Sequence, residues 1–174
     1  MIKLLLKDFT LALENNMRSV VTTIRFNSAS LGNQKDATGK FLFQKNAANS
    51  KILFLASWHK ANMKLAAEAL GRHQTSAQKI FWDIEVDFDI TKLTEYYRFC
   101  SKSGNRTHWA IHEAIEKGQT VSIACLVPDT ITTTDFEALM VLAGRHKGLS
   151  PWKPGQFGHF EVLAVHETKN TIQE

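Results

Sequence analysis

Cysteine and proline are scarce, with two cysteines and three prolines in 174 residues. Cys100 and Cys125 lack C-x-x-C spacing, which is typical of a reduced, intracellular protein. No run of 18 apolar residues occurs, so we expect neither a membrane span nor secretion, and a cytoplasmic location. The P-loop, the dinucleotide fingerprint and the nucleophile elbow are also missing, and we expect no cofactor and no metal.

Charge is distributed unevenly along the chain. The net charge is +4 and the pI is near 9.1. Residues 37–67 contain no acid, whereas acidic side chains gather in residues 83–95. This two-sided pattern suits a polyanion on one surface and a basic partner on another. The lysines of the basic stretch are Lys40, Lys45, Lys51, Lys60 and Lys64.

The hydrophobic pattern predicts one α+β domain over residues 1–174. We expect early strands at 2–13 and 19–26, then short strands at 41–44 and 52–56. A helix at 57–70, a strand at 80–88, a strand at 120–127, a helix at 134–144 and a strand at 159–165 follow. Residues 91–118 are expected to form a helical insertion. From residue 52 onward this is the βαββαβ order of a ferredoxin-like domain, with extra N-terminal strands.

A glycine-rich loop over residues 143–160 is the most distinctive stretch. It lacks acids and combines cations with aromatic rings. Glycines let main-chain N–H groups approach phosphates, and aromatic faces can stack on bases. A surface loop stiffened by its prolines is the plainer interpretation. The glycines are Gly144, Gly148, Gly155 and Gly158.

The sequence GRHKGLSPWKPGQFGHFEV resembles the glycine-rich loop of the RAMP superfamily, the CRISPR-associated RNA-binding proteins. It is also similar to the ending of small phage-encoded relatives. The resemblance covers residues 52–165, and its specific motif is the loop alone. Gly144 and Gly148 stand apart where the family often has adjacent glycines, and two prolines stiffen the loop.

The resemblance implies that the chain binds single-stranded RNA, or DNA, with copies assembling along the strand in a larger nucleoprotein complex. It places the nucleic acid on the loop and on the adjacent basic helix. The expected binding residues are Lys60, Lys64, Arg145, Lys147, Trp152, Lys153 and Phe157.

Other functions stay open at this point. Some RAMP members cleave RNA without metal, which makes His59, beside Lys60, the candidate general base of an endoribonuclease. His108 and His112, four apart on an expected helix, could hold zinc, although an exposed helix face is the more common reason for such a pair. The acidic row on residues 83–89 could bind a metal, or a neighbouring subunit as part of a protein-docking inhibitor or assembly subunit.

Overall fold

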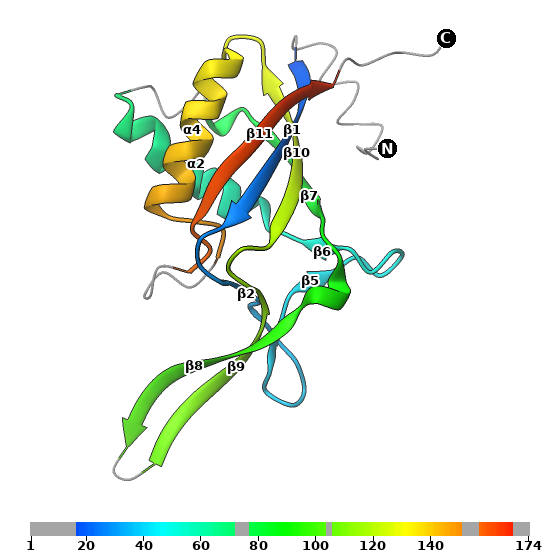
Figure 1. Ribbon diagram of the computed structural model, residues 1–174, viewed down its shortest axis with the longest axis vertical. Helices are drawn as coiled ribbons and strands as arrows, with labels where there is room; N and C mark the ends of the chain where they lie inside the picture. The colour runs from blue at the N-terminus through cyan, green and yellow to red at the C-terminus, as the bar shows by residue number, and fades with distance from the viewer. Residues whose placement is uncertain (1–16, 72–76, 104–105, 151–156, 169–174) are drawn as a thin grey trace.

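The structure is a computed structural model that describes residues 17–71, 77–103, 106–150 and 157–168. Its main sheet has six strands in the order β11-β1-β10-β7-β6-β5. The strands are β1 (Met17–Phe26), β5 (Gln44–Lys45), β6 (Ile52–Leu53), β7 (Phe81–Asp87), β10 (Thr120–Pro128) and β11 (Phe160–Thr168). Helices α2 (Ala56–Ala69) and α4 (Thr133–His146) lie together on one face of this sheet (Figure 1).

Strand β1 is an interior strand of the main sheet, next to the edge strand β11. It pairs antiparallel with β10 on one side and with β11 on the other. The strand expected at 19–26 is thus present as β1, but it is an interior strand of the main sheet instead of an addition to it. Ile52 and Leu53 form the short strand β6 beside β7. The observed mixture of helices and antiparallel strands is consistent with a ferredoxin-like fold.

Both helices bury one stripe of side chains against the sheet. In α4 the stripe is Phe136, Leu139, Met140, Ala143 and Gly144, which has the spacing of one helix face. The N-cap of α4 is Thr132, whose Oγ1 accepts a hydrogen bond from Asp135 N at 3.1 Å, two residues before the expected cap. Helix α2 begins after Leu55 without a side-chain cap, so the expected Ser57 cap is wrong, while Gly71 ends the helix with φ +64° as expected.

Strand β7 departs from the expected alternation. Trp82 pairs with Cys125 and Val86 with Ile123, so three residues of β7 lie opposite the single residue Ala124 of β10. The bulge turns Ile84 outward and leaves it 41% exposed, although alternation predicts it in the core.

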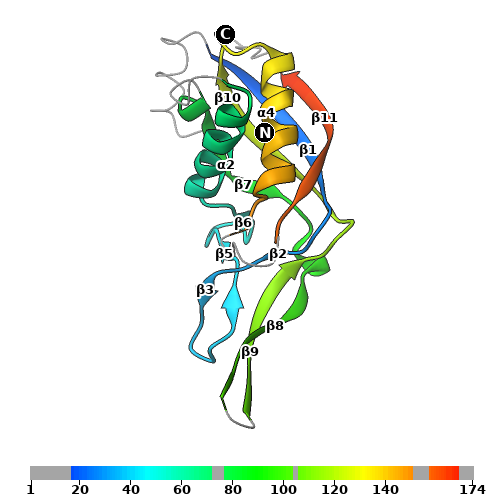
Figure 2. The same cartoon turned by 90° about the vertical axis from the view of Figure 1, so that its left-hand side faces the viewer.

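The expected helical insertion at 91–118 is wrong. A short 3₁₀ turn, η1 (Ile90–Lys92), leads into β8 (Thr94–Ser103), which pairs antiparallel with β9 (Arg106–Ile115). Ala110, His112 and Ala114 of β9 are buried at the period of two that a strand requires, and Ile115 at the end of the strand is buried as well. The β8–β9 hairpin projects away from the main sheet (Figures 1 and 2).

A second, small sheet supports the foot of this hairpin. It has the order β2-β9-β4-β3, with β8 paired to β9. Its short strands are β2 (Ser30–Leu31), β3 (Gln34–Lys35) and β4 (Phe41–Leu42). The ring of Phe41 stacks on buried His112 with centroids 4.7 Å apart. Within the described part of the chain, no helix is long and apolar enough to cross a membrane.

Candidate nucleic-acid interface

The two arms of the glycine-rich loop cross at Gly148 and Gly158. Leu149 N donates to the Gly158 carbonyl oxygen at 2.7 Å, and both glycines have positive φ, +69° and +73°. A Cβ on Gly148 would lie 2.3 Å from the Gly158 carbonyl carbon, and one on Gly158 would lie 2.5 Å from the Leu149 carbonyl oxygen. The crossing therefore has room only for glycine at both positions.

Polar side chains from distant parts of the chain hold this crossing in place. Asn62 of α2 is buried and donates through Nδ2 to the Gly148 carbonyl oxygen at 2.7 Å. Ser30 Oγ donates to the Leu149 carbonyl oxygen at 2.5 Å, and Gly158 N donates to the Ala29 carbonyl oxygen at 2.8 Å. These bonds satisfy backbone carbonyls that would otherwise be buried without a partner.

The described glycines of the loop thus serve the packing of the protein itself. Gly144 is a further example, because a Cβ there would lie 2.2 Å from the Phe160 carbonyl oxygen. We expected these glycines to admit a ligand to the main chain, but at Gly144, Gly148 and Gly158 the neighbouring atoms belong to the chain. Gly155, Trp152 and Lys153 lie outside the described residues.

The expected basic residues lie on the two helices. Lys60 and Lys64 are exposed on α2, away from its buried stripe, and Arg145 is exposed in the last turn of α4. Lys147, half-buried, caps the C-terminus of α4, where the helix dipole favours positive charge. Because α2 packs against α4, the structure brings these cations into one helical layer beside the start of the loop.

The hairpin carries an aromatic groove that sequence analysis missed. Three of its rings, Tyr97, Phe99 and Trp109, are 52% to 58% exposed. Phe99 and Trp109 meet edge to face with centroids 5.7 Å apart. The groove is open, has a volume of about 550 Å³ and is lined by Tyr96, Tyr97, Arg98, Phe99, Cys100, Trp109 and Phe157.

Phe157 connects this groove to the glycine-rich loop. Its ring meets Tyr96 edge to face, with centroids 5.4 Å apart. Phe157, an expected binding residue, therefore lies in the groove. It belongs to the glycine-rich loop, whose other arm starts at the basic C-terminal end of α4. A signal for the hairpin was present in the sequence, because aromatic and β-branched residues flank Ser-Gly-Asn at 103–105, a common hairpin turn composition.

His59 lies on the buried face of α2 and is not exposed to a substrate. Its ring stacks on Trp82 with centroids 4.4 Å apart, and burial lowers its pKa to about 3. A general base must reach the hydroxyl that it deprotonates and have a pKa near the working pH. The structure gives His59 neither property, so the candidate role of His59 in RNA cleavage is wrong.

The fold also separates the two histidines of the possible zinc site. His108 and His112 are four apart on a strand, which separates them by about 13 Å. His112 is buried, with Nδ1 2.9 Å from the Gly32 carbonyl oxygen, whereas His108 is exposed. Among the described residues no group of three metal-ligating side chains is found.

The acidic row on β7 is partly used inside the molecule. The Glu85 carboxylate accepts hydrogen bonds from the amides of Asn46 and Asn49. Asp83 Oδ1 accepts from Glu85 N at 3.0 Å, and burial raises the pKa of Asp83. Asp87 alone of these three is exposed. The row is therefore less available to a basic partner than its sequence indicates.

Comparison with known proteins gives a match in structure. No protein-family model matches the chain. No curated protein is similar to it in sequence. A protein chain in the cryo-EM structure of the Type III-B Cmr-beta bound to cognate target RNA has a similar fold, with a TM-score of 0.66 and 12% identity over 93% of this chain. Our chain spans 66% of the length of that chain. At this identity the likeness shows a similar fold and nothing further.

Proposed function

We propose that this chain binds single-stranded nucleic acid, RNA before DNA, as a subunit of a larger nucleoprotein complex. The observation that carries the proposal is the groove of exposed rings on the β8–β9 hairpin. Exposed aromatic rings are costly in water and supply stacking faces for unpaired bases. Stacking tolerates every base, so this groove suits a single strand of varied sequence.

Positive charge on the helical layer supports the same function. Lys60, Lys64 and Arg145 are exposed on the helical layer, and Lys147 stands where the glycine-rich loop begins. Cations of this kind attract the phosphate backbone and release its counterions, which supplies affinity without sequence preference. With Trp152 and Lys153 they remain the binding residues that we propose outside the groove.

The topology provides a further argument. We propose that β1, α2, β7, β10, α4 and β11 form the βαββαβ unit of a ferredoxin-like domain, with β8–β9 inserted between its second and third strands. The order β11-β1-β10-β7 and the placement of both helices on one face agree with that unit. The similar chain comes from an assembly bound to target RNA, which is why we favour RNA and association with other subunits.

The experiment that tests the proposal is a titration of labelled single-stranded RNA and DNA with matched variants. Phe99→Ala and Trp109→Ala each remove one groove ring, while Phe81→Ala removes a ring that is 43% exposed on β7, outside the groove. We expect the groove variants to weaken binding by roughly 5- to 150-fold, because each stacked base contributes about 1–3 kcal/mol. Phe81→Ala should bind like the parent protein.

Repeating the titration at several salt concentrations tests the helical layer. Substituting Lys60, Lys64 or Arg145 by alanine should lower the slope of log K against log salt by about 0.7 each. Equal binding by the groove variants and Phe81→Ala would overturn the groove as the binding surface. Lack of binding by the parent protein at low salt would overturn the function and direct attention to a protein partner.

A further inference from the structure

Two carboxylates face each other across the foot of the hairpin. Glu95 on β8 is the direct cross-strand partner of Glu113 on β9. Like charges in directly opposed positions destabilise a strand pair unless each charge is compensated. The hairpin therefore needs cations at this level, and its own strands do not provide them at these two positions.

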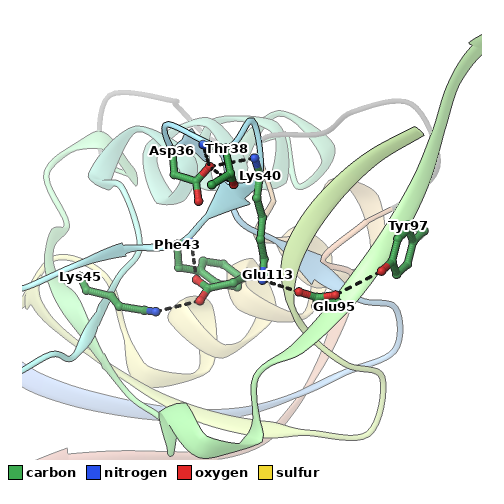
Figure 3. Close-up of polar contacts among 8 residues, drawn as sticks. All are labelled: Asp36, Thr38, Lys40, Phe43, Lys45, Glu95, Tyr97 and Glu113. Atoms are coloured by element: carbon green, nitrogen blue, oxygen red, sulfur yellow. Dashed lines mark hydrogen bonds and ion pairs between the residues drawn. The ribbon is translucent and has the colours of Figure 1, made fainter. Parts of the chain in front are cut away.

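The compensating cations come from the segment that carries β4 and β5. Lys40 Nζ lies 2.6 Å from Glu95 Oε1, and Lys45 Nζ lies 2.8 Å from Glu113 Oε1 (Figure 3). Phe43 N, between the two lysines, donates to the other oxygen of Glu113 at 2.9 Å. One short segment thus binds both strands of the hairpin through two carboxylates.

The same contacts continue into the aromatic groove. Tyr97 OH donates to Glu95 Oε2 at 3.2 Å, so the carboxylate that accepts from Lys40 also accepts from a groove residue. On the other side, the backbone N of Lys40 donates to Asp36 Oδ1 at 2.9 Å, which also accepts from Thr38. A continuous series of bonds runs from the Asp36 turn to the Tyr97 ring (Figure 3).

Lys40 and Glu95 both stay charged in this arrangement. Their mutual hydrogen bond raises the pKa of the Lys40 ammonium and lowers the pKa of the Glu95 carboxyl. The Glu113 side chain is 15% exposed, which shields its pair with Lys45 from water.

We propose that Lys40 and Lys45 are positioning residues for nucleic-acid binding: they fix the hairpin so that its groove meets the glycine-rich loop, and they do not bind phosphate. The inference rests on the proposed function. It divides the basic stretch of residues 37–67 into two classes, because Lys60 and Lys64 point to solvent while Lys40 and Lys45 are paired with carboxylates. Charge counting along the sequence cannot make that division.

Salt dependence distinguishes a positioning lysine from a phosphate contact. We expect the double variant Lys40→Met, Lys45→Met to weaken RNA binding by about three- to tenfold. The reason is that a smaller fraction of this variant has the hairpin in the binding orientation. The slope of log K against log salt should stay unchanged. A slope lower by about 0.7 per lysine would show phosphate contact and overturn the proposal.

A charge exchange provides the second readout. The variant Lys40→Glu with Glu95→Lys keeps the pair with its signs reversed, and should recover most of the affinity lost by Lys40→Met. Lys35→Met removes the same charge from an exposed position on β3 and should cost less than Lys40→Met. No recovery in the exchanged variant, or equal losses for Lys35→Met and Lys40→Met, would overturn positioning.

Amide hydrogen exchange tests the clamp, by which we mean the contacts of Lys40, Phe43 and Lys45 with the hairpin carboxylates, in the absence of nucleic acid. The Phe43 amide should exchange faster in the Lys45→Met variant, because the Glu113 carboxylate that accepts from it is then held less firmly. Unchanged exchange would contradict the clamp. If the parent protein does not bind RNA, the proposed function fails. If Phe99→Ala and Trp109→Ala weaken RNA binding and the lysine variants do not, the positioning role alone fails.

Discussion

The crossing of Gly148 and Gly158 makes a quantitative prediction about stability. Gly148→Ala meets two obstacles, a φ of +69° and a Cβ position 2.3 Å from the Gly158 carbonyl carbon. The left-handed conformation costs about 1–2 kcal/mol for a residue with a Cβ. Forcing the two loop arms apart at the crossing adds about 1–3 kcal/mol. We therefore expect Gly148→Ala to lower the free energy of unfolding by about 2–5 kcal/mol.

Two other glycines separate these terms. Gly118 has a φ of +89° and no atom within 4 Å of its Cβ position, so Gly118→Ala carries the conformational cost without the clash. Gly144 lies in α4, where alanine gains about 1 kcal/mol of helix propensity but meets the Phe160 carbonyl oxygen at 2.2 Å. We expect losses of about 1 kcal/mol for Gly118→Ala and about 2 kcal/mol for Gly144→Ala.

Urea unfolding of the three variants, followed by tryptophan fluorescence, measures the differences directly. The decisive comparison is Gly148→Ala against Gly118→Ala. If Gly148→Ala costs no more than Gly118→Ala, the close approach at the crossing does not contribute to stability, and the reasoning that assigns these glycines to packing is refuted.

Two further predictions concern the buried histidine and the cysteines. Burial lowers the pKa of His59 to about 3, so between about pH 6.5 and 3 the unfolded chain binds a proton that the native chain does not, and stability falls as the pH falls. Between pH 7 and pH 4.5, the His59→Phe variant should lose about 2.5 kcal/mol less stability than the parent protein. Urea unfolding at the two pH values measures this difference. An equal loss in both proteins would contradict the buried neutral ring. Cys100 is exposed in the groove whereas Cys125 is buried and burial raises its pKa, so a maleimide should label Cys100 alone in the native protein. Bound RNA should slow that labelling, and an unchanged rate at saturating RNA would count against the groove.

Local patterns in the sequence were sufficient for the elements of the main sheet and its helices. The β-branched run at 19–26, the strand at 120–127 and the helices near 57–70 and 134–144 all appear close to their expected positions. Each of these segments packs one face against a continuous core, which imposes a regular spacing on its apolar residues. The N-cap of α4 lies two residues before its expected position because Thr132, Thr133 and Thr134 offer competing caps, whereas α2 begins after Leu55 without a side-chain cap.

The β8–β9 hairpin escaped prediction for the opposite reason. Much of it projects from the body with aromatic side chains exposed, so no single buried face imposes an alternating pattern along it. Only the half of β9 beside β2 and β4 shows that pattern, at Ala110, His112 and Ala114. Because most of the residues that line the groove belong to the hairpin, the groove could not be predicted without the hairpin.

Composition indicates which residue types the glycine-rich loop and the basic stretch contain, but the role of each residue depends on the tertiary fold. Gly148 meets Gly158 only because residues 27–30 and Asn62 hold the loop arms together. Lys40 faces Glu95, more than fifty residues away in sequence, instead of solvent. Such roles depend on long-range contacts that residue spacing does not encode, because a side chain's partner is set by the packing of whole elements rather than by its neighbours along the chain.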